Sequence, residues 1–140
     1  VMAERPNICK YLDMPLQHGS NQVLKLMRRG ITREKTEELI AAIRAKVPGV
    51  ALRTTLIAGH PGETEEDFEE MYRFVEQTRF DRLGVFTYSH EENTHSHTMP
   101  DDVPEKTKQE RADAVMELQQ GISSELNQAK IGRALKVLFD

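Results

Sequence analysis

The chain has 140 residues, of which 38% are hydrophobic and 30% charged, and this suffices for one domain with a modest core. Its net charge of −4 gives no support for a basic field over the whole surface, as nucleic-acid binding would need, and leaves room only for local patches. No apolar stretch has the length that a membrane span requires, and the single cysteine, Cys9, is typical of a cytoplasmic protein.

The first predicted unit is a strand over residues 8–14 followed by two helices. The polar residues Gln17 and His18 come directly after this strand. Helical spacing of apolar residues then predicts a short helix over residues 20–29 and a second helix over residues 32–47, which a proline and a glycine end.

The second unit, residues 52–68, changes from strand to helix periodicity across a turn that contains glycine and proline. Residues 50–57 are apolar and β-branched almost without alternation, which predicts a strand of a parallel sheet covered on both faces. Gly59 lets the backbone come close to whatever lies above the end of the strand. Thr64 and Asp67 then have the spacing of a capping box, which predicts the start of an amphipathic helix.

The remaining chain predicts a third strand, a long helix and one further strand. The third strand covers residues 83–88, the helix covers residues 103 to about 130, and residues 134–140 have the composition of a strand after a glycine turn. Strands that alternate with helices indicate a parallel sheet or barrel joined by right-handed crossovers. Function in such folds lies at the carboxyl ends of the strands.

Four runs of this sequence, in this order, resemble the radical S-adenosylmethionine methylthiotransferases: YLDMPLQHGSNQVLKLMRRG, LRTTLIAGHPGETEEDF, RLGVFTYSHEENT and VPEKTKQERADAVMELQQGIS. The resemblance covers nearly the whole chain. It implies an α/β fold, the C-terminal half of a partial TIM-like barrel with three parallel βα units, a long C-terminal helix and the first strand of a TRAM domain. The implied boundaries are 1–131 for the barrel part and 132–140 for the start of the TRAM domain.

Members of this family carry a CxxxCxxC loop for one four-iron four-sulfur cluster and three further cysteines for a second. This chain has one cysteine, and one thiol cannot hold such a cluster. We therefore expect it to be the carboxy-terminal part of a longer enzyme, beginning near the fourth barrel strand and inactive by itself. Half a barrel exposes a strand edge and an apolar inner face, which predicts self-association of the fragment.

The resemblance implies the activity of the whole enzyme. S-adenosylmethionine is cleaved reductively to a radical, a hydrogen is removed from the β-carbon of an aspartate in a small-subunit ribosomal protein, and a methylthio group is inserted. The cofactors are S-adenosylmethionine and two four-iron four-sulfur clusters. Two alternatives stay open: a sister enzyme of the family that modifies an adenosine of transfer RNA, and a non-catalytic βα interaction module.

The resemblance suggests that Gln17 and His18 contact the ribose or methionine part of S-adenosylmethionine; the alternative is a loop pair that caps the next helix. Arg53 is a cation inside an apolar strand, where it needs an anion. That anion is either the methionine carboxylate or an acid of a neighbouring strand such as Asp13. Arg28 and Arg29, near a helix end, either meet an acidic or phosphate partner or complement the helix dipole, and the dipole is favoured.

By the same resemblance, residues 57–62 pack their backbone against the adenine, with Ile57 and Gly59 as contact residues; the alternative is a turn that needs glycine for its geometry alone. Phe86 and Tyr88 alternate on the third strand and share one face. In the family this strand end offers backbone groups to the adenine amine. Core packing is the alternative for both aromatic residues, and it is favoured for Phe86.

Three histidines, His90, His95 and His97, lie in the polar run HEENTHSHTMPDD. Two of them have a spacing that permits chelation in an extended segment. The run lacks cysteine and is typical of a mobile surface loop, so we predict a substrate-facing loop and no metal site.

Overall fold

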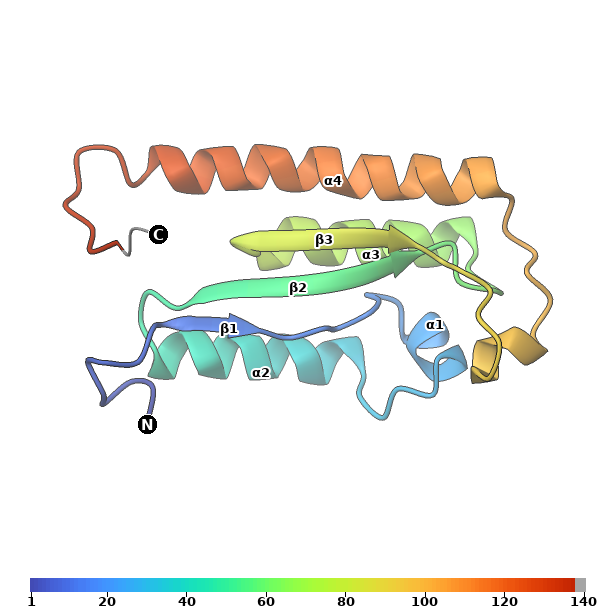
Figure 1. Ribbon diagram of the computed structural model, residues 1–140, viewed down its shortest axis with the longest axis horizontal. Helices are drawn as coiled ribbons and strands as arrows, with labels where there is room; N and C mark the ends of the chain where they lie inside the picture. The colour runs from blue at the N-terminus through green and yellow to red at the C-terminus, as the bar shows by residue number, and fades with distance from the viewer. Residues whose placement is uncertain (138–140) are drawn as a thin grey trace.

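The computed structural model describes residues 1–137, which form a three-stranded parallel sheet with helices packed on one side (Figure 1). The strands are β1 (Tyr11–Asp13), β2 (Ala51–Ala58) and β3 (Arg82–Thr87), in the order β1-β2-β3. The helices are α1 (Asn21–Leu26), α2 (Arg33–Lys46), α3 (Glu65–Thr78), the 3-10 helix η1 (His95–Thr98) and α4 (Glu105–Gln128). The predicted α/β architecture of three parallel βα units and a long C-terminal helix is confirmed.

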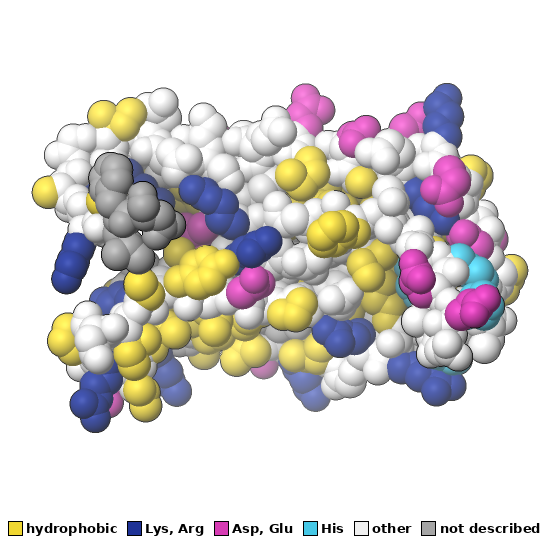
Figure 2. All heavy atoms as spheres, viewed as in Figure 1, with side chains coloured by type: hydrophobic (Ala, Val, Ile, Leu, Met, Phe, Trp, Pro, Cys, Tyr) yellow, Lys and Arg dark blue, Asp and Glu magenta, His cyan; other side chains and the backbone are white. Residues whose placement is uncertain are grey.

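Alternate residues of β2 divide the sheet into a covered and an open face. Leu52, Thr54, Leu56 and Ala58 are buried, and the three apolar ones join apolar residues of α2, α3 and α4 in one core. The residues between them, such as Arg53, are at least partly exposed. Figure 2 looks onto the open face, where hydrophobic side chains lie uncovered over the strands. Within residues 1–137 this strand is covered on one face only, and the open face is the apolar inner face that half a barrel is predicted to expose.

Helix α3 begins as its sequence predicts. The Thr64 side chain accepts a hydrogen bond from the Asp67 amide, and the Asp67 carboxylate accepts one from the Thr64 amide, which completes the capping box. Three acidic residues in the first turn face the positive end of the helix dipole. This start fixes the direction in which the chain leaves β2.

The observed elements are shorter than predicted at several ends. Strand β1 begins at Tyr11 because its partner strand begins at Ala51, which pairs with it. Helix α1 ends at Leu26, since Arg28 has a left-handed backbone with φ of 56°. Helix α4 extends from Glu105 to Gln128, within the predicted range.

Beyond α4, residues 133–137 form neither helix nor strand, and the predicted strand over 134–140 continues into residues that lie outside the described part. A strand needs a neighbour for its backbone hydrogen bonds, so the start of a TRAM domain at residue 132 stays a prediction. Within residues 1–137, no helix is both long and apolar enough to cross a membrane.

Candidate functional site

The site lies at the carboxyl ends of the three strands, where a pocket of about 540 Å³ opens on the uncovered face of the sheet. Its walls come from the loop after β1, from β2, from β3 and from the segment that follows β3. The lining residues are Gln17, Met27, Arg29, Thr55, Ile57, His60, Phe86, Thr87, Tyr88, Ser89, Glu91, Thr94 and Ser96. The structure thus brings four predicted residues together: Gln17, Ile57, Phe86 and Tyr88.

Gln17 extends the pairing of β1 beyond its last residue. Its amide donates to the Thr55 carbonyl at 3.0 Å, and its carbonyl accepts from the Ile57 amide at 2.8 Å. Its φ of 76° is in the left-handed region, which a residue with a side chain seldom adopts. The backbone pairing holds the residue in this conformation, and strain of this kind is concentrated at functional sites.

His18, the next residue, turns away from the pocket lining and is buried. The Ser20 amide donates to its Nδ1 at 2.9 Å, and its Nε2 lies 2.9 Å from the Glu63 carboxylate. Because a backbone amide can only donate, Nδ1 is the acceptor. Nε2 therefore carries the proton and donates a hydrogen bond to Glu63. His18 therefore holds its own loop in shape, which is close to the alternative of a loop pair that caps the next helix.

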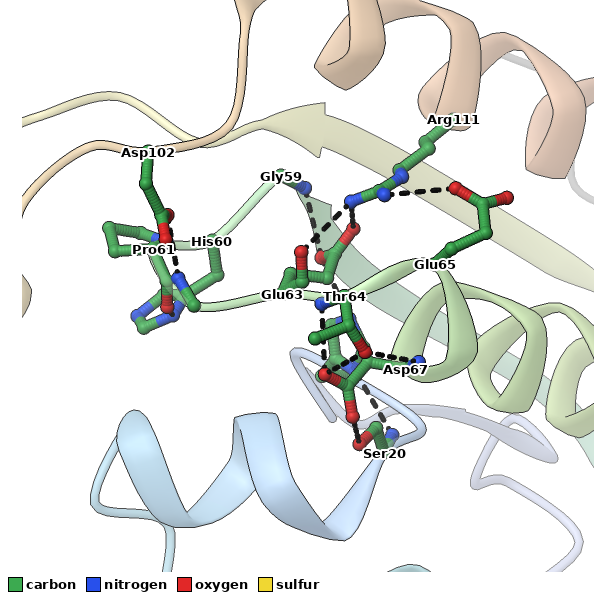
Figure 3. A network of polar contacts seen from close by, with 12 residues as sticks. Ser20, Gly59, His60, Pro61, Glu63, Thr64, Glu65, Asp67, Asp102 and Arg111 are labelled. Atoms are coloured by element: carbon green, nitrogen blue, oxygen red, sulfur yellow. Dashed lines mark hydrogen bonds and ion pairs between the residues drawn. The ribbon is translucent and has the colours of Figure 1, made fainter.

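Glu63 is the centre of a buried polar network (Figure 3). One carboxylate oxygen accepts from the Gly59 amide at 2.9 Å as well as from His18, and the other accepts from Arg111 Nη1 at 2.8 Å. Glu63 and Arg111 are both buried, and Arg111 comes from α4. One carboxylate therefore joins the loops that follow β1 and β2 to the long helix.

A second buried carboxylate, Asp67, also joins these two loops (Figure 3). The Ser20 hydroxyl donates to it at 2.6 Å, and the Thr64 amide and hydroxyl donate at 2.9 and 2.8 Å. Burial by itself would raise the pKa of Asp67, but these hydrogen bonds outweigh burial and hold the pKa below its ordinary value. The carboxylate therefore stays charged, and it fixes the start of α3 against the first loop.

His60 is a pocket residue that the sequence analysis missed. Its Nδ1 lies 2.8 Å from the Pro61 carbonyl and must carry a proton there, while its Nε2 lies 2.7 Å from the Ser96 hydroxyl. Burial lowers the pKa of this imidazole. Its position in the AGHPGE turn, between two glycines, was the available signal, because such a turn brings its intervening side chain to the end of a strand.

The segment between β3 and α4 closes one side of the pocket. As the sequence predicts, it lies at the surface, with most of its residues exposed. Three contacts tie it to neighbouring elements: Ser96 to His60, Asp102 to the Gly62 amide at 2.9 Å, and Asp101 to Lys108 at 2.8 Å. Its polar side chains bind the neighbouring turn and α4. Within residues 1–137, no group of three or more histidine, cysteine, aspartate or glutamate residues is placed to hold a metal ion.

The two aromatic residues of the third strand are placed opposite to prediction. Phe86 is 64% exposed on the open face, whereas Tyr88 is only 8% exposed. Tyr88 follows the last residue of β3 and packs its ring edge-on to His60 at 5.3 Å, with its hydroxyl 3.1 Å from His90 Nδ1. Core packing therefore belongs to Tyr88, and the assignment that favoured Phe86 is wrong.

Two arginines were candidates for an anion. Arg53 is half-exposed on the open face and lies 3.5 Å from Asp13, so it forms the ion pair with Asp13 that was one of its two expected partners. It is not the buried cation that the apolar strand predicts. It does not line the pocket. Arg29 does line it, and there its guanidinium donates to the Pro15 carbonyl at 2.8 Å.

Comparison with known proteins adds the family. The family model of the Radical SAM superfamily matches residues 1–75, more than half of the chain. This chain belongs to the radical SAM superfamily. The match includes β1, β2, Glu63 and six of the thirteen lining residues, from Gln17 to His60. The other seven, from Phe86 to Ser96, lie beyond it.

Curated relatives of this radical SAM chain carry the name ribosomal protein uS12 methylthiotransferase RimO. The protein from Cytophaga hutchinsonii is 67% identical over the whole chain, that from Christiangramia forsetii 56%, and that from Bacteroides thetaiotaomicron 55%. The predicted resemblance to the methylthiotransferases is thereby confirmed. The chain spans about a third of the length of these relatives (32%, 31% and 32%).

A solved structure supports the fold of the radical SAM chain. Coproporphyrinogen III oxidase (HemN) from Escherichia coli, described as a radical SAM enzyme, matches 86% of this chain and 27% of its own with a TM-score of 0.60. The sequence identity is 24%, so this likeness concerns the fold alone.

The superfamily implies S-adenosylmethionine and an iron–sulfur cluster, and the described residues fit these two groups differently. The pocket has the volume of a small-molecule site and combines apolar walls with a few polar groups, which suits S-adenosylmethionine. A cluster does not fit, because Cys9 is the single cysteine of the chain and is exposed ahead of β1.

Proposed function

We propose that this chain is the part of a radical SAM methylthiotransferase that holds S-adenosylmethionine at the ends of its strands, and that the enzyme acts on ribosomal protein uS12. The observation that carries the proposal is the pocket built by Gln17, Ile57 and Tyr88 at the carboxyl edge of a parallel sheet. The names of the relatives supply the substrate. Such an enzyme works in the cytoplasm, where ribosomes are made.

Each part of the pocket suits one part of the cofactor. Ile57 and Phe86 are register neighbours on the open face and form an apolar wall for the adenine. The backbone of Gln17 is held at the pocket mouth by its pairing with β2. The side-chain amide of Gln17 can donate and accept hydrogen bonds with the ribose hydroxyls or the methionine part. Arg29 supplies the cation of the lining.

The methionine carboxylate is better met by Arg29 than by Arg53. Arg53 lies outside the lining and already has Asp13 as its counter-ion. Arg29 donates to a carbonyl, that of Pro15. Among the ion pairs of the described residues, none joins Arg29 to a carboxylate. A guanidinium also offers the fork geometry that suits a carboxylate.

The iron–sulfur chemistry lies outside this chain in the proposal. The two four-iron four-sulfur clusters take their cysteines from a part of the enzyme that the chain does not contain, and by itself the chain does not cleave the cofactor. S-adenosylmethionine supplies the radical reactivity for methylthiolation of an aspartate. The residues of this chain bind it, orient it and keep water from its reactive end.

The test compares Arg29→Ala with Arg53→Ala in the protein expressed from the full reading frame, reconstituted without oxygen. Loss of a charge-assisted hydrogen bond is expected to weaken S-adenosylmethionine binding about 10- to 100-fold in Arg29→Ala. Arg53→Ala should bind like the wild type, since its partner is Asp13.

The substrate is tested separately by mass spectrometry of uS12 incubated with the wild-type protein. Gain of one methylthio group on an aspartate supports the proposal, and modification of transfer RNA in place of uS12 contradicts it. If Arg53→Ala weakens cofactor binding and Arg29→Ala does not, the assignment of the carboxylate is reversed.

A further inference from the structure

Lys108 is a buried lysine that the site described above does not use. It lies in the first turn of α4 and is 0% exposed, although lysine is almost never fully buried without partners. It does not line the pocket. Its side chain instead contacts Gly59 and Tyr88, the residues that directly follow β2 and β3.

The ammonium group of Lys108 has its full set of partners. Nζ lies 2.7 Å from the Glu105 carboxylate and 2.8 Å from that of Asp101. It is also 3.5 Å from the carbonyl of Tyr88 and 5.3 Å from the centre of the Tyr88 ring. Burial by itself would lower the pKa of Lys108, but the two carboxylates raise it above its ordinary value, so the group stays charged.

The aliphatic stem of Lys108 fills the space that a side chain at Gly59 would need. A Cβ atom built on Gly59 would lie 2.1 Å from Cγ of Lys108 and less than 3.0 Å from its Cβ and Cδ. Gly59 also has a φ of 80°, which favours glycine. The close approach that the sequence predicts at Gly59 is therefore made by Lys108, and neither residue lines the pocket.

Together these contacts hold the last rung of the β2–β3 ladder. The Tyr88 amide donates to the Ala58 carbonyl at 2.8 Å, and Lys108 packs on Gly59, the next residue, while its ammonium faces the Tyr88 carbonyl and ring. Tyr88 is also one of the residues that line the pocket. The geometry points to Lys108 as a positioning residue that fixes the ends of β2 and β3, through Gly59 and Tyr88, and so forms the pocket wall before a ligand arrives.

This role can be separated from a general contribution to stability. In Lys108→Met the stem stays nearly the same size and only the ammonium is lost. Glu105 is 80% exposed and Asp101 is 28% exposed, so water can solvate both carboxylates after the change. The folded state should therefore lose little, whereas Tyr88 loses the group that holds its carbonyl and ring. A purely structural lysine would show the reverse balance.

The experiment uses Lys108→Met and the matched control Lys106→Met in the protein from the full reading frame. Lys106 lies on the same helix turn but is exposed, and it pairs with Glu110 at 3.7 Å. The measurements are S-adenosylmethionine affinity, thermal unfolding, and amide hydrogen exchange over residues 56–62 and 84–90. If the aligned wall falls to about a tenth of the population, affinity in Lys108→Met falls roughly tenfold. Exchange should rise in these two segments, with a melting temperature close to that of the control.

The outcomes separate this inference from the proposed function, on which only the identity of the ligand rests. If the wild type binds no S-adenosylmethionine, the proposed function fails. The positioning role of Lys108 is then tested by hydrogen exchange alone. Equal exchange in the two variants overturns the positioning role. So does a rise in exchange over the whole chain with a lower melting temperature, because that is the signature of a residue that only stabilises the fold.

Discussion

The substitution Arg111→Met should remove a large part of the stability of this chain, because it leaves the Glu63 carboxylate buried without its counter-charge. Arg111 gives Glu63 two contacts, at 2.8 Å to the carboxylate and 3.3 Å to the carbonyl, and it gives Glu65 one at 3.1 Å. Glu65 is exposed and regains water at a cost of about 0–1 kcal/mol. Glu63 cannot regain water, and breaking a buried pair of this kind costs about 3–5 kcal/mol.

A loss of that size lowers the melting temperature by about 10–15 °C in a chain of this length. The assay is urea unfolding followed by circular dichroism, with Arg73→Met as the matched control. Arg73 pairs with Glu69 at 3.3 Å on the exposed surface of α3, so its loss should cost under about 1 kcal/mol. The double variant Glu63→Gln with Arg111→Met should regain part of the loss, since an uncharged amide is cheaper to bury. Equal costs for Arg111→Met and Arg73→Met would refute this account of the network.

Two further predictions concern pH and self-association. Burial lowers the pKa of His60 below its ordinary value of 6.5, so the unfolded chain takes up the proton first as the pH falls. The stability that neutral His60 contributes is therefore complete above about pH 7 and declines as the pH falls below 6.5 toward the folded-state pKa. In His60→Gln the midpoint of urea unfolding should depend less on pH over that range. Phe86→Lys should reduce self-association of the 140-residue chain in sedimentation at about 50 µM, because Phe86 lies uncovered on the open sheet face; Leu39→Lys, an exposed site on α2, is its control, and equal effects of the two would contradict a role for that face.

The elements that the sequence predicts well are those whose causes are local. The start of α3 follows from Thr64 and Asp67, three residues apart, and the end of β2 follows from the Gly59 turn. The position of the pocket follows from the alternation of strands and helices, because parallel strands bring their carboxyl ends to one edge. Each of these inferences needs only a short stretch of sequence.

The parts that the sequence does not predict depend on contacts between distant residues. His18 and Glu63 are 45 residues apart, and Arg111 is 48 residues beyond Glu63, so no local pattern links them. For Arg53 the sequence leaves two anions open, and the pair with Asp13 forms because β1 and β2 lie side by side, 40 residues apart in the chain. The placement of Phe86 and Tyr88 depends on where β3 ends, and strand ends are the least certain feature of any sequence pattern.

The buried charges behind the pocket are better explained by geometry than by stability. Apolar residues of similar volume in place of Glu63 and Arg111 together could pack as stably, since desolvation offsets much of the attraction in a buried ion pair. Apolar contacts have no direction, however, whereas the Glu63 carboxylate fixes the Gly59 amide and the His18 ring at set angles. The pocket lies on the open face of the sheet, where residues 1–137 place no covering layer against its walls. Directional contacts from behind are what can hold such walls in place, and the buried carboxylates and Lys108 lie at that position.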